Sequence, residues 1–448
     1  MMNRFIFDNL TYKLNDRDVM LLNLTSYRRK IVTRKMIDKL CVIETKINQG
    51  CELTENENQL YRQLRKSKQI LSKDIEEQVS TILAKEAVLD LNKIPVRSIT
   101  LNLTHKCNFN CYYCYQNVYK HRPEYIKHMT AQDVEDIVSY LDLLPYDTTV
   151  LDEVVISGGE PLLKENIDAV NYICNALKSK RKTIFTNGVN ILKYASIVDY
   201  TKIDEFQISL DGTTEVITNV NGYSGSANSI LEGIEYILNL GKTVSLVVMW
   251  TKHLESRIDE FVSLIQSAGL QNYKNFEMKI IVAKNFYNYN NLDTNIYSLE
   301  YIKDCRKKYN GQLRKIGCSI ELFSEVNFLQ TLLHRPINKI INPRYKRCDI
   351  NRSIPMVFEP NGEVHWCMCL GKSTGIIGNF KDKTIDMNRI EQYGSRTVFS
   401  IEKCKSCKLK YICSGGCVLG VPNESDLHTS VCSIFDNEYF WEHLEDFV

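Results

Sequence analysis

The sequence predicts an α/β protein whose central part is a partial (β/α)6 version of the TIM barrel. Six short apolar segments that resemble strands alternate with helical segments between residues 98 and 283. Strands separated by helices pair in parallel, and six of them are too few for the eight-stranded barrel. The chain has 448 residues, which leaves room for a module before this region and a cysteine-rich region after it.

The elements of the central part follow from their periodicity and their turn residues. The expected strands are 98–103, 153–157, 183–187, 205–210, 243–249 and 277–283. The expected helices are 130–143, 165–179, 189–199, 226–240 and 254–268. Thr130 with Asp133 three residues later marks a capped start for the first of these helices. The central domain is therefore expected to span residues 96–285.

Residues 1–95 lack this alternation. They begin with a short alternating stretch at Phe5 and Phe7 and continue through two basic helical segments, around 27–40 and 55–82. Thr54 and Glu57 have the spacing of a capping box. We expect either a winged-helix-like module with an edge strand around residues 4–7, or a helical extension that covers the edge of the barrel. Residues 286–345 are tyrosine-rich and partly helical, and we expect them to bridge to a last domain at 346–448.

Composition limits the classes of partner. Net charge is +2, with 44% hydrophobic and 25% charged residues, which is typical of a soluble globular protein. Near-neutral charge gives no reason to expect a nucleic-acid partner. No apolar run approaches the roughly 20 residues that cross a bilayer, and the first residues do not fit a secretory signal. We expect a cytoplasmic protein with no membrane partner.

Cysteine usage is the unusual feature of this composition. Sixteen cysteines occur, and most are grouped within 107–114, 348–369 and 404–432. Disulfides are rare in a reducing cytosol, and short spacings are typical of metal ligands. Four cysteines fall in no motif and are expected to be small buried hydrophobic residues: Cys41, Cys51, Cys174 and Cys305.

The first group is a trio, Cys107, Cys111 and Cys114, in the loop after the first barrel strand. Loops at the carboxyl ends of parallel strands carry the active site in such folds. Three thiolates can hold an iron–sulfur cubane and leave one iron open, and the spacing favours this reading. The alternative is a zinc site in which His105 supplies a fourth ligand.

This trio, with Tyr113 before its last cysteine, resembles the signature of the radical S-adenosylmethionine (SAM) enzymes. Gly158-Gly159-Glu160-Pro161 follows the second strand, where that family keeps a GGEP loop. Ser209-Leu210-Asp211-Gly212 ends the fourth strand, where the family often contacts the ribose of SAM. The resemblance covers about residues 97–285 and rests on three motifs in order, each at a strand end.

The resemblance implies a [4Fe–4S] cluster whose open iron binds SAM and a 5′-deoxyadenosyl radical that abstracts hydrogen from a substrate. It implies that Gly158, Gly159 and Glu160 hold the methionyl amine, that Ser209 and Asp211 lie at the ribose, and that Tyr113 lies near the adenine. An arginine often follows the ribose loop in this family. Here Asn221 is the candidate for the contact with the SAM carboxylate. A plain strand-end turn is the alternative reading of Ser209 and Asp211.

The later cysteines resemble the seven-cysteine pattern of the SPASM domain, which holds two auxiliary [4Fe–4S] clusters; a zinc ribbon is the alternative. By that pattern the first auxiliary cluster has three ligands and the second has four. The implied ligands are Cys348, Cys367 and Cys417 for the first cluster, and Cys404, Cys407, Cys413 and Cys432 for the second. Cys369 or Cys318 is the candidate for the fourth ligand of the first cluster, and a substrate thiolate is the other option.

Three candidate functions are compatible with this resemblance. The first is a maturase that installs a thioether or carbon–carbon crosslink in a ribosomally made precursor peptide, with residues 1–95 recognising the leader. The second is an enzyme of the anaerobic sulfatase-maturing type, which oxidises Cys or Ser to formylglycine. In that family an aspartate follows the second SPASM cysteine, whereas Met368 follows Cys367 here. The third is an RNA-modifying enzyme or a non-catalytic electron carrier. A flavodoxin- or ferredoxin-type donor is the expected source of electrons.

Overall fold

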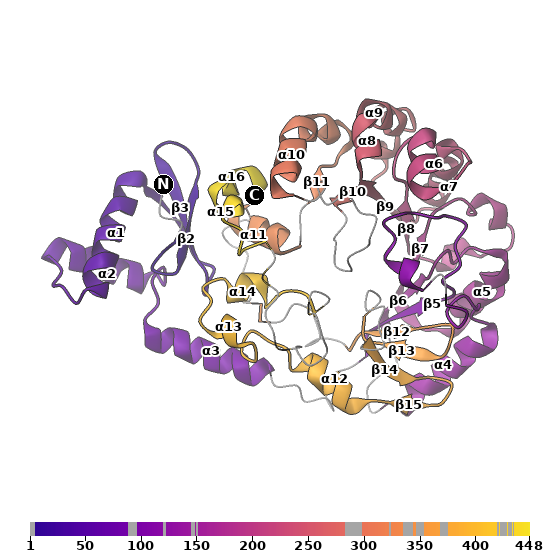
Figure 1. Cartoon of the computed structure of the whole chain (residues 1–448), viewed down its shortest axis with the longest axis horizontal. Coiled ribbons are helices and arrows are strands. Elements are labelled where there is room, and N and C mark those ends of the chain that lie inside the picture. Colours follow the sequence, from indigo (N-terminus) through magenta and orange to yellow (C-terminus); the bar gives the residue numbers. More distant parts are fainter. Residues whose placement is uncertain are drawn as a thin grey trace. The chain divides into compact units, whose positions relative to one another are not determined.

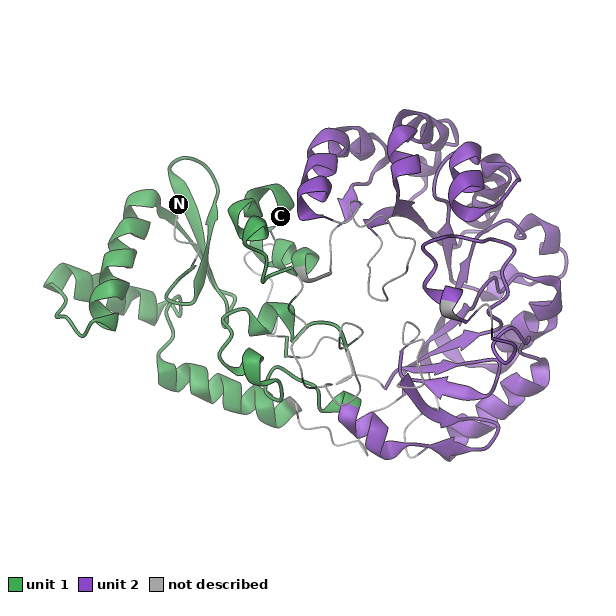
Figure 2. Ribbon diagram, viewed as in Figure 1, with its two compact units in different colours: residues 1–89, 322–348, 393–448 green, residues 90–321, 349–392 purple. Residues whose placement is uncertain are grey.

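The computed structural model describes most of the chain. The described residues are 5–87, 96–119, 122–144, 148, 151–282, 298–321, 324–334, 344–345, 354–367, 375–418, 421, 428, 432 and 434–448. The chain divides into two compact units (Figure 2). Unit 1 comprises residues 1–89, 322–348 and 393–448, and unit 2 comprises residues 90–321 and 349–392.

Unit 2 is built on a mainly parallel sheet (Figure 1). The strands are β5 (Ser98–Asn102), β6 (Leu151–Ser157), β7 (Ser179–Thr186), β8 (Glu205–Ser209), β9 (Thr243–Trp250), β10 (Phe276–Val282), β11 (Ile320–Glu321), β12 (Met356–Phe358), β13 (Glu363–His365), β14 (Ile376–Asn379) and β15 (Thr384–Ile385). Strands β5 to β10 lie in sequence order and pair in parallel. The predicted partial (β/α)6 barrel is therefore confirmed.

Helices cover this sheet, as crossover connections between parallel strands require. They are α4 (Ala131–Leu143), α5 (Ile167–Ala176), α6 (Thr214–Asn221), α7 (Ala227–Asn239), α8 (Lys252–Ser256), α9 (Ile258–Ser267) and α10 (Leu299–Leu313); α12 (Met387–Gly394) lies where the chain passes to unit 1. The capping box predicted at Thr130 and Asp133 is present. The predicted helix at 189–199 was wrong, since only a 3-10 turn forms there, at Leu192–Tyr194. Gly188 opens this connection with a φ of +79°, outside the helical region.

The sheet extends beyond the six predicted strands, which the periodicity did not indicate. β12 pairs in parallel with β5 on the side opposite β6, with Phe358 level with Leu101. β13, β14 and β15 then continue antiparallel. Part of the cysteine-rich region, residues 349–392, thus belongs to the same compact unit as the barrel. This addition brings new side chains beside the loop that follows β5.

Unit 1 contains a four-stranded antiparallel sheet in the order β1-β2-β3-β4. The strands are β1 (Phe5–Ile6), β2 (Asn9–Lys13), β3 (Asp18–Asn23) and β4 (Arg29–Thr33). Its helices are α1 (Arg34–Asn48), α2 (Glu55–Lys66), α3 (Lys73–Ala87), α11 (Ser324–His334), α13 (Glu402–Lys405), α14 (Lys410–Cys413), α15 (Glu438–Glu442) and α16 (Leu444–Phe447). The capping box at Thr54 and Glu57 is present. The predicted helix at 27–40 was wrong in its first part, because residues 29–33 form β4.

Side chains pack against both faces of the N-terminal sheet. Val19, Leu21 and Val32 pack with Ile37 and Leu40 of α1 in one apolar core. Side chains alternate between faces along a strand, so Leu10 and Tyr12 point the other way, where the ring of Tyr12 meets His334 of α11. Residues from both ends of the chain therefore share one folding unit.

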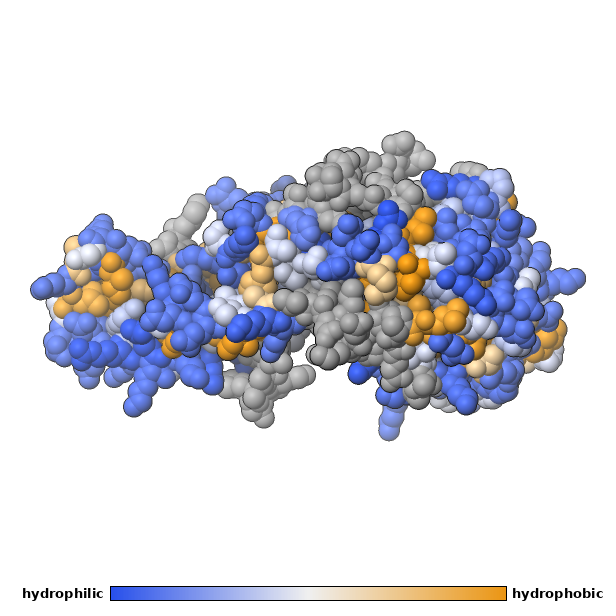
Figure 3. Space-filling model, turned by 90° about the horizontal axis from the view of Figure 1, so that it is seen from below, coloured by the Kyte–Doolittle hydropathy of each residue, from blue (hydrophilic) through white to orange (hydrophobic). Residues whose placement is uncertain are grey.

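The surface agrees with the composition. Figure 3 shows hydrophilic side chains over most of the face in view, with apolar residues in smaller groups between them. In the part of the chain that the structure describes, none of the helices has the length and apolar character needed to cross a bilayer.

Candidate functional site

The cysteine trio lies in the loop that follows β5, at the carboxyl edge of the parallel sheet. Cys107, Cys111 and Cys114 are all half-buried. The Phe109 amide donates to Cys107 Sγ at 3.3 Å. Burial raises the pKa of Cys111 to about 12, and the nearby Asp211 carboxylate and the other two thiols add to this rise. These thiols are close enough to affect one another, and they must release protons when they bind metal.

The predicted GGEP loop packs directly on the segment that leads to the trio. The Gly159 amide donates to the Thr104 carbonyl at 2.6 Å, and the Glu160 amide donates to the Lys106 carbonyl at 2.9 Å. A Cβ at Gly158 would lie 2.4 Å from the Thr104 oxygen, and one at Gly159 would lie 2.0 Å from the Lys106 oxygen. Only glycine allows this approach, so these two residues fix the start of the cysteine loop.

The side chain of Glu160 joins three segments of the site. Its carboxylate is fully buried and accepts from the Leu162 amide at 2.9 Å, the Thr186 hydroxyl at 2.7 Å and the Asn187 amide at 2.8 Å. Burial raises its pKa to about 7, although the three donors oppose this. The side-chain Nδ2 of Asn187 in turn donates to Asn108 Oδ1 at 2.7 Å, and Asn108 lies inside the cysteine loop. Asn187 was not among the predicted site residues, although it is the last residue of the expected strand 183–187.

A second buried carboxylate, Asp211, lies after β8. Asp211 Oδ2 accepts from the Tyr113 hydroxyl and, at 2.6 Å, from Asn221 Nδ2, while Oδ1 accepts from the Met249 amide at 2.8 Å. Burial raises the pKa of Asp211, while these donors oppose the rise. The side-chain Nδ2 of Asn221 also donates to Cys111 Sγ at 3.0 Å, and the backbone carbonyl of Asn221 accepts from the backbone amide of Asn110.

The structure therefore brings most predicted site residues together. Tyr113, Asp211 and Asn221 form one hydrogen-bonded group with Cys111, and the GGEP loop contacts the residues before Cys107. Ser209 is the last residue of β8, two positions before Asp211. The binding of SAM by these residues stays a prediction.

The C-terminal cysteines are divided between the units. In unit 1, Cys404, Cys407 and Cys432 lie within electrostatic reach of one another, since each of the other two raises the pKa of Cys404 after the larger effect of burial. Cys413 and Cys417 flank a turn in the same unit, and Cys367 lies in unit 2. Cys348 and Cys369 lie outside the described residues. Cys318 is buried beside the Leu313 carbonyl, and burial raises its pKa to about 12.

A buried arginine shapes the turn between Cys413 and Cys417. Arg396 donates from its two terminal nitrogens to the carbonyls of Gly416, at 2.9 Å, and Gly415, at 2.8 Å. Ser414 and both glycines have positive φ values, which a helix or strand never uses. Arg396 therefore stabilises an unusual backbone turn beside the cysteines, and nothing in the sequence pattern pointed to it.

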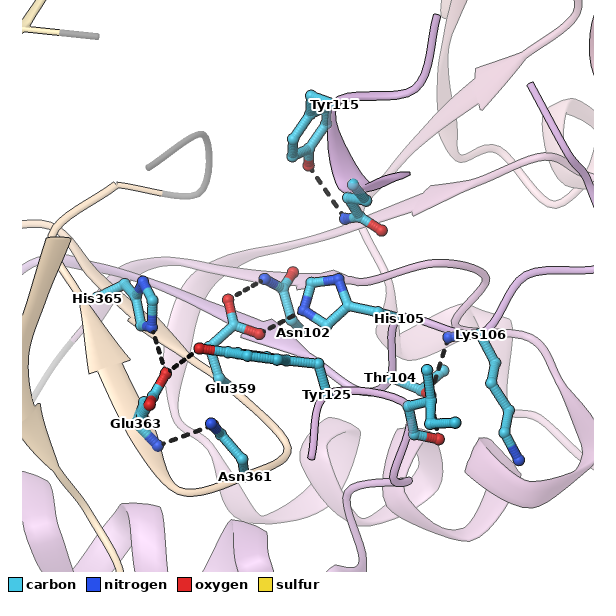
Figure 4. A network of polar contacts seen from close by, with 12 residues as sticks. Asn102, Thr104, His105, Lys106, Tyr115, Tyr125, Glu359, Asn361, Glu363 and His365 are labelled. Carbon is cyan, nitrogen blue, oxygen red and sulfur yellow. Dashed lines mark hydrogen bonds and ion pairs between the residues drawn. The ribbon is translucent and has the colours of Figure 1, made fainter. Parts of the chain in front are cut away.

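The residues of the first site fit an iron–sulfur cluster. Within the described ranges, no three His, Cys, Asp or Glu side chains are already arranged as a metal site. The trio nevertheless supplies three thiols from one loop, with the Phe109 amide and Asn221 Nδ2 donating to two of the sulfurs. Such hydrogen bonds to sulfur are typical of iron–sulfur sites. His105 is engaged elsewhere, with Glu359 (Figure 4). Of the cysteines outside the motifs, Cys174 and Cys305 are buried as expected, whereas the prediction for Cys51 was wrong because it is exposed.

Known proteins show similarity to this chain at two levels. Residues 101–265 match the radical SAM superfamily. A probable GTP 3′,8-cyclase of Methanococcus maripaludis is 32% identical over 149 residues, which are 33% of this chain and 48% of that protein. The GTP 3′,8-cyclase of Synechocystis is 25% identical over 187 residues, 41% of this chain and 53% of that protein. The chain thus spans about half the length of these curated relatives.

Solved structures resemble a larger part of the chain. SuiB of Streptococcus suis bound to its precursor peptide SuiA has a TM-score of 0.52 and 18% identity, over 95% of this chain and 98% of that one. Native anSMEcpe with bound AdoMet has a TM-score of 0.50 and 17% identity, over 78% of this chain and 95% of that one. At these identities the likeness shows the fold.

Proposed function

We propose that this protein is a SPASM-type maturase that crosslinks a ribosomally made peptide, because residues 101–265 match the radical SAM superfamily. The crosslink is a thioether or a carbon–carbon bond. When bound, a [4Fe–4S] cluster and SAM supply a 5′-deoxyadenosyl radical that removes hydrogen from the substrate. The residues of this chain hold and orient those groups and exclude water from them.

The observation that carries the proposal is the open edge of the N-terminal sheet. β4 is the last strand of that sheet, and no further strand pairs with it among the described residues. The Arg34 amide bonds to Arg17 of the turn before β3, and the Asn23 amide bonds to Arg28. Because hydrogen-bonded positions alternate along an antiparallel pair, Lys30 and Val32 also face β3. The amides and carbonyls of Ile31 and Thr33 therefore point to the open side.

An extended peptide can add a strand at such an edge. Ile31 is 59% exposed and offers an apolar side chain to a passing strand. Lys30 is also exposed and would attract an acidic segment, with an effect that salt weakens. Arg29 differs, since its guanidinium donates to the Leu333 carbonyl at 2.7 Å. We infer that β4, and not the two-residue β1, receives the leader of a precursor peptide.

The proposed cofactor ligands follow the cysteine spacing of the sequence, and for the first cluster the geometry of its loop agrees with that spacing. Cys107, Cys111 and Cys114 hold the first cluster, and the loop at Gly158 and Gly159 lines the methionyl end of SAM. Cys348, Cys367 and Cys417 hold the first auxiliary cluster, with Cys369 or Cys318 as its fourth ligand. Cys404, Cys407, Cys413 and Cys432 hold the second. Crosslinking removes one hydrogen atom by the radical and then one electron and one proton, and an auxiliary cluster is a suitable acceptor for that electron.

The competing function is nucleotide cyclisation, because the curated relatives are named GTP 3′,8-cyclases. Their similarity covers at most 41% of this chain in the two proteins compared above, a length close to that of the radical SAM domain. A substrate as small as a nucleotide would not need the open strand edge at β4, which lies in unit 1 and outside the barrel. The similarity of fold to SuiB in its peptide-bound form supports the peptide reading. Formylglycine formation is less favoured, since Met368 replaces the expected aspartate.

The test compares the two substrates on the same protein. Full-length enzyme, reconstituted without oxygen and reduced by a flavodoxin- or ferredoxin-type donor, is given SAM and either GTP or synthetic peptides from the short reading frames found next to its gene. We expect the peptide to lose a pair of hydrogen atoms by mass spectrometry and GTP to remain unchanged. A 3′,8-cyclised nucleotide together with an unmodified peptide would contradict the proposal.

A further inference from the structure

The loop that carries the cysteine trio has two arms that lie side by side. The outgoing arm, residues 103–107, leads from β5 to Cys107, and the return arm, described at residue 119 and at residues 122–129, leads back toward α4. The His105 amide donates to the Tyr125 carbonyl at 3.1 Å, and the Met129 amide donates to the Leu103 carbonyl at 2.7 Å. Cys107 ends the outgoing arm, and Cys111 and Cys114 lie in the segment between the arms, where the short 3-10 turn at Tyr115–Val118 is the regular element.

A hairpin made by β12 and β13 reaches both arms. β12 pairs with β5, and its next residue, Glu359, is therefore level with Asn102 at the end of β5. The Glu359 amide donates to the Glu363 carbonyl at 2.9 Å, and the Gly362 amide donates to the Glu359 carbonyl at 3.0 Å. Gly362 has a φ of +103°, which lets the turn close this tightly. The turn thus presents two glutamates four residues apart.

The first glutamate holds the outgoing arm (Figure 4). Glu359 accepts from Asn102 Nδ2 at 2.8 Å and from His105 Nε2 at 2.6 Å. The Glu359 and His105 side chains are each only 1% exposed. The ring of Tyr119, from the return arm, stacks on His105 with centroids 4.3 Å apart. Hydrogen bonds to a charged carboxylate are strong and directional. The two bonds to Glu359 therefore hold the outgoing arm at one distance from the hairpin and in one orientation.

The second glutamate holds the return arm. Glu363 Oε2 accepts from the Tyr125 hydroxyl at 2.5 Å and from His365 Nε2 at 2.9 Å. Burial would raise the pKa of Glu363, but hydrogen bonds from His365, Tyr125 and Asn361 lower it to about 2. This carboxylate therefore stays ionised in the folded protein. His365 ends β13, two residues before Cys367.

We propose that the β12–β13 hairpin is a clamp in which Glu359 and Glu363 are positioning residues for the cysteine loop. Each glutamate holds one arm, and the strand that carries Glu363 runs on to Cys367. The clamp thus sets the position of the first cluster's ligands relative to the strand that leads to an auxiliary ligand. An ordinary added strand would contribute apolar packing, and it would not need a buried and a half-buried carboxylate bonded to the two arms of the same loop.

The test measures the cysteine loop itself. Glu359→Gln and Glu363→Gln are made in the full chain, and the iron-free proteins are alkylated under native conditions. Loss of a buried hydrogen bond to a charged group should open the loop more often and raise the alkylation rate of Cys107 and Cys111 by about tenfold. The exposed Cys51 is the internal standard, and the buried Cys174 in α5 reports global unfolding. In the reconstituted proteins, the change that SAM causes in the EPR signal of the first cluster should weaken.

The matched control is Glu153→Gln. Glu153 also bonds across strands, to the Thr183 hydroxyl at 2.9 Å, but on the β6–β7 pair and outside the clamp. It should behave like wild type. Tyr125→Phe deletes one hydroxyl and tests the return arm if a glutamate variant does not fold. Unchanged alkylation and EPR in the clamp variants, or an equal rise for Cys174, overturns the proposal. None of these readouts needs a peptide, so the result is independent of the proposed substrate.

Discussion

At the scale of single residues, polar side chains that are buried or, for Glu363, half-buried organise the site. Glu160, Asp211, Glu359 and Glu363 each accept hydrogen bonds from two or more groups on different segments. A buried carboxylate is costly unless its partners compensate, so each one strongly selects the arrangement that satisfies it. Hydrogen bonds to these four carboxylates, more than regular secondary structure, hold the loops around the trio in position.

Glu160 makes the stability of the protein depend on pH. Its pKa is about 7 in the folded protein, against about 4.3 in an unfolded chain. The folded state therefore binds the proton more tightly. This contribution is fully present below about pH 4 and falls by about 4 kcal/mol as pH rises through about 7. Glu160→Gln should remove this part of the pH dependence, measured by chemical denaturation between pH 5 and pH 8.

The control for this prediction is again Glu153→Gln, because Glu153 is partly exposed and lies away from the trio. It should keep the wild-type slope. An unchanged slope in Glu160→Gln would show that Glu160 is not the group responsible.

At the scale of elements, the strand edges decide what each sheet can do. In unit 2 the parallel sheet is extended at β5 by β12, so a segment far along the sequence closes over the cysteine loop. In unit 1 the sheet ends at β4, with its outward amides at Ile31 and Thr33. Open strand edges are normally protected, and β4 is a place where an extended partner can pair.

Ile31→Pro tests this edge. Proline removes the outward amide and places its ring in the path of an added strand, but it leaves the bonds between β4 and β3 in place because Ile31 does not face β3. We expect affinity for the precursor peptide to fall about tenfold or more. Fluorescence anisotropy with a labelled precursor measures this. Ile31→Thr keeps the amide and should lose much less affinity, whereas equal affinity of Ile31→Pro and wild type would exclude β4.

At the scale of the whole molecule, the sequence predicted the repeating part well. The six barrel strands and the two capping boxes are governed by local periodicity and local hydrogen bonds, and they form within a few residues of the expected positions. The helix expected at 189–199 failed because Gly188 redirects the chain. β4 was missed because its basic residues, Arg29 and Lys30, look like a helix surface.

The contacts that complete the site depend on long-range pairing, which periodicity does not report. Glu359 lies 254 positions from His105 along the chain, and only the pairing of β12 with β5 brings them together. Asn187 bonds to the side chain of Asn108 and Arg396 to backbone carbonyls, and neither residue fits a motif. The trio, the GGEP loop and Asp211 were found because their spacing is local and each follows a strand.

Formation of 5′-deoxyadenosine is the measurement that tests the central claim most directly. Full-length protein, reconstituted without oxygen, reduced and given SAM, should release 5′-deoxyadenosine. Cys111→Ala removes a thiol that lies beside Asn221 and should abolish this product while losing about four irons, with the auxiliary clusters retained. We expect both losses in this variant. Wild-type amounts of 5′-deoxyadenosine from Cys111→Ala would contradict it.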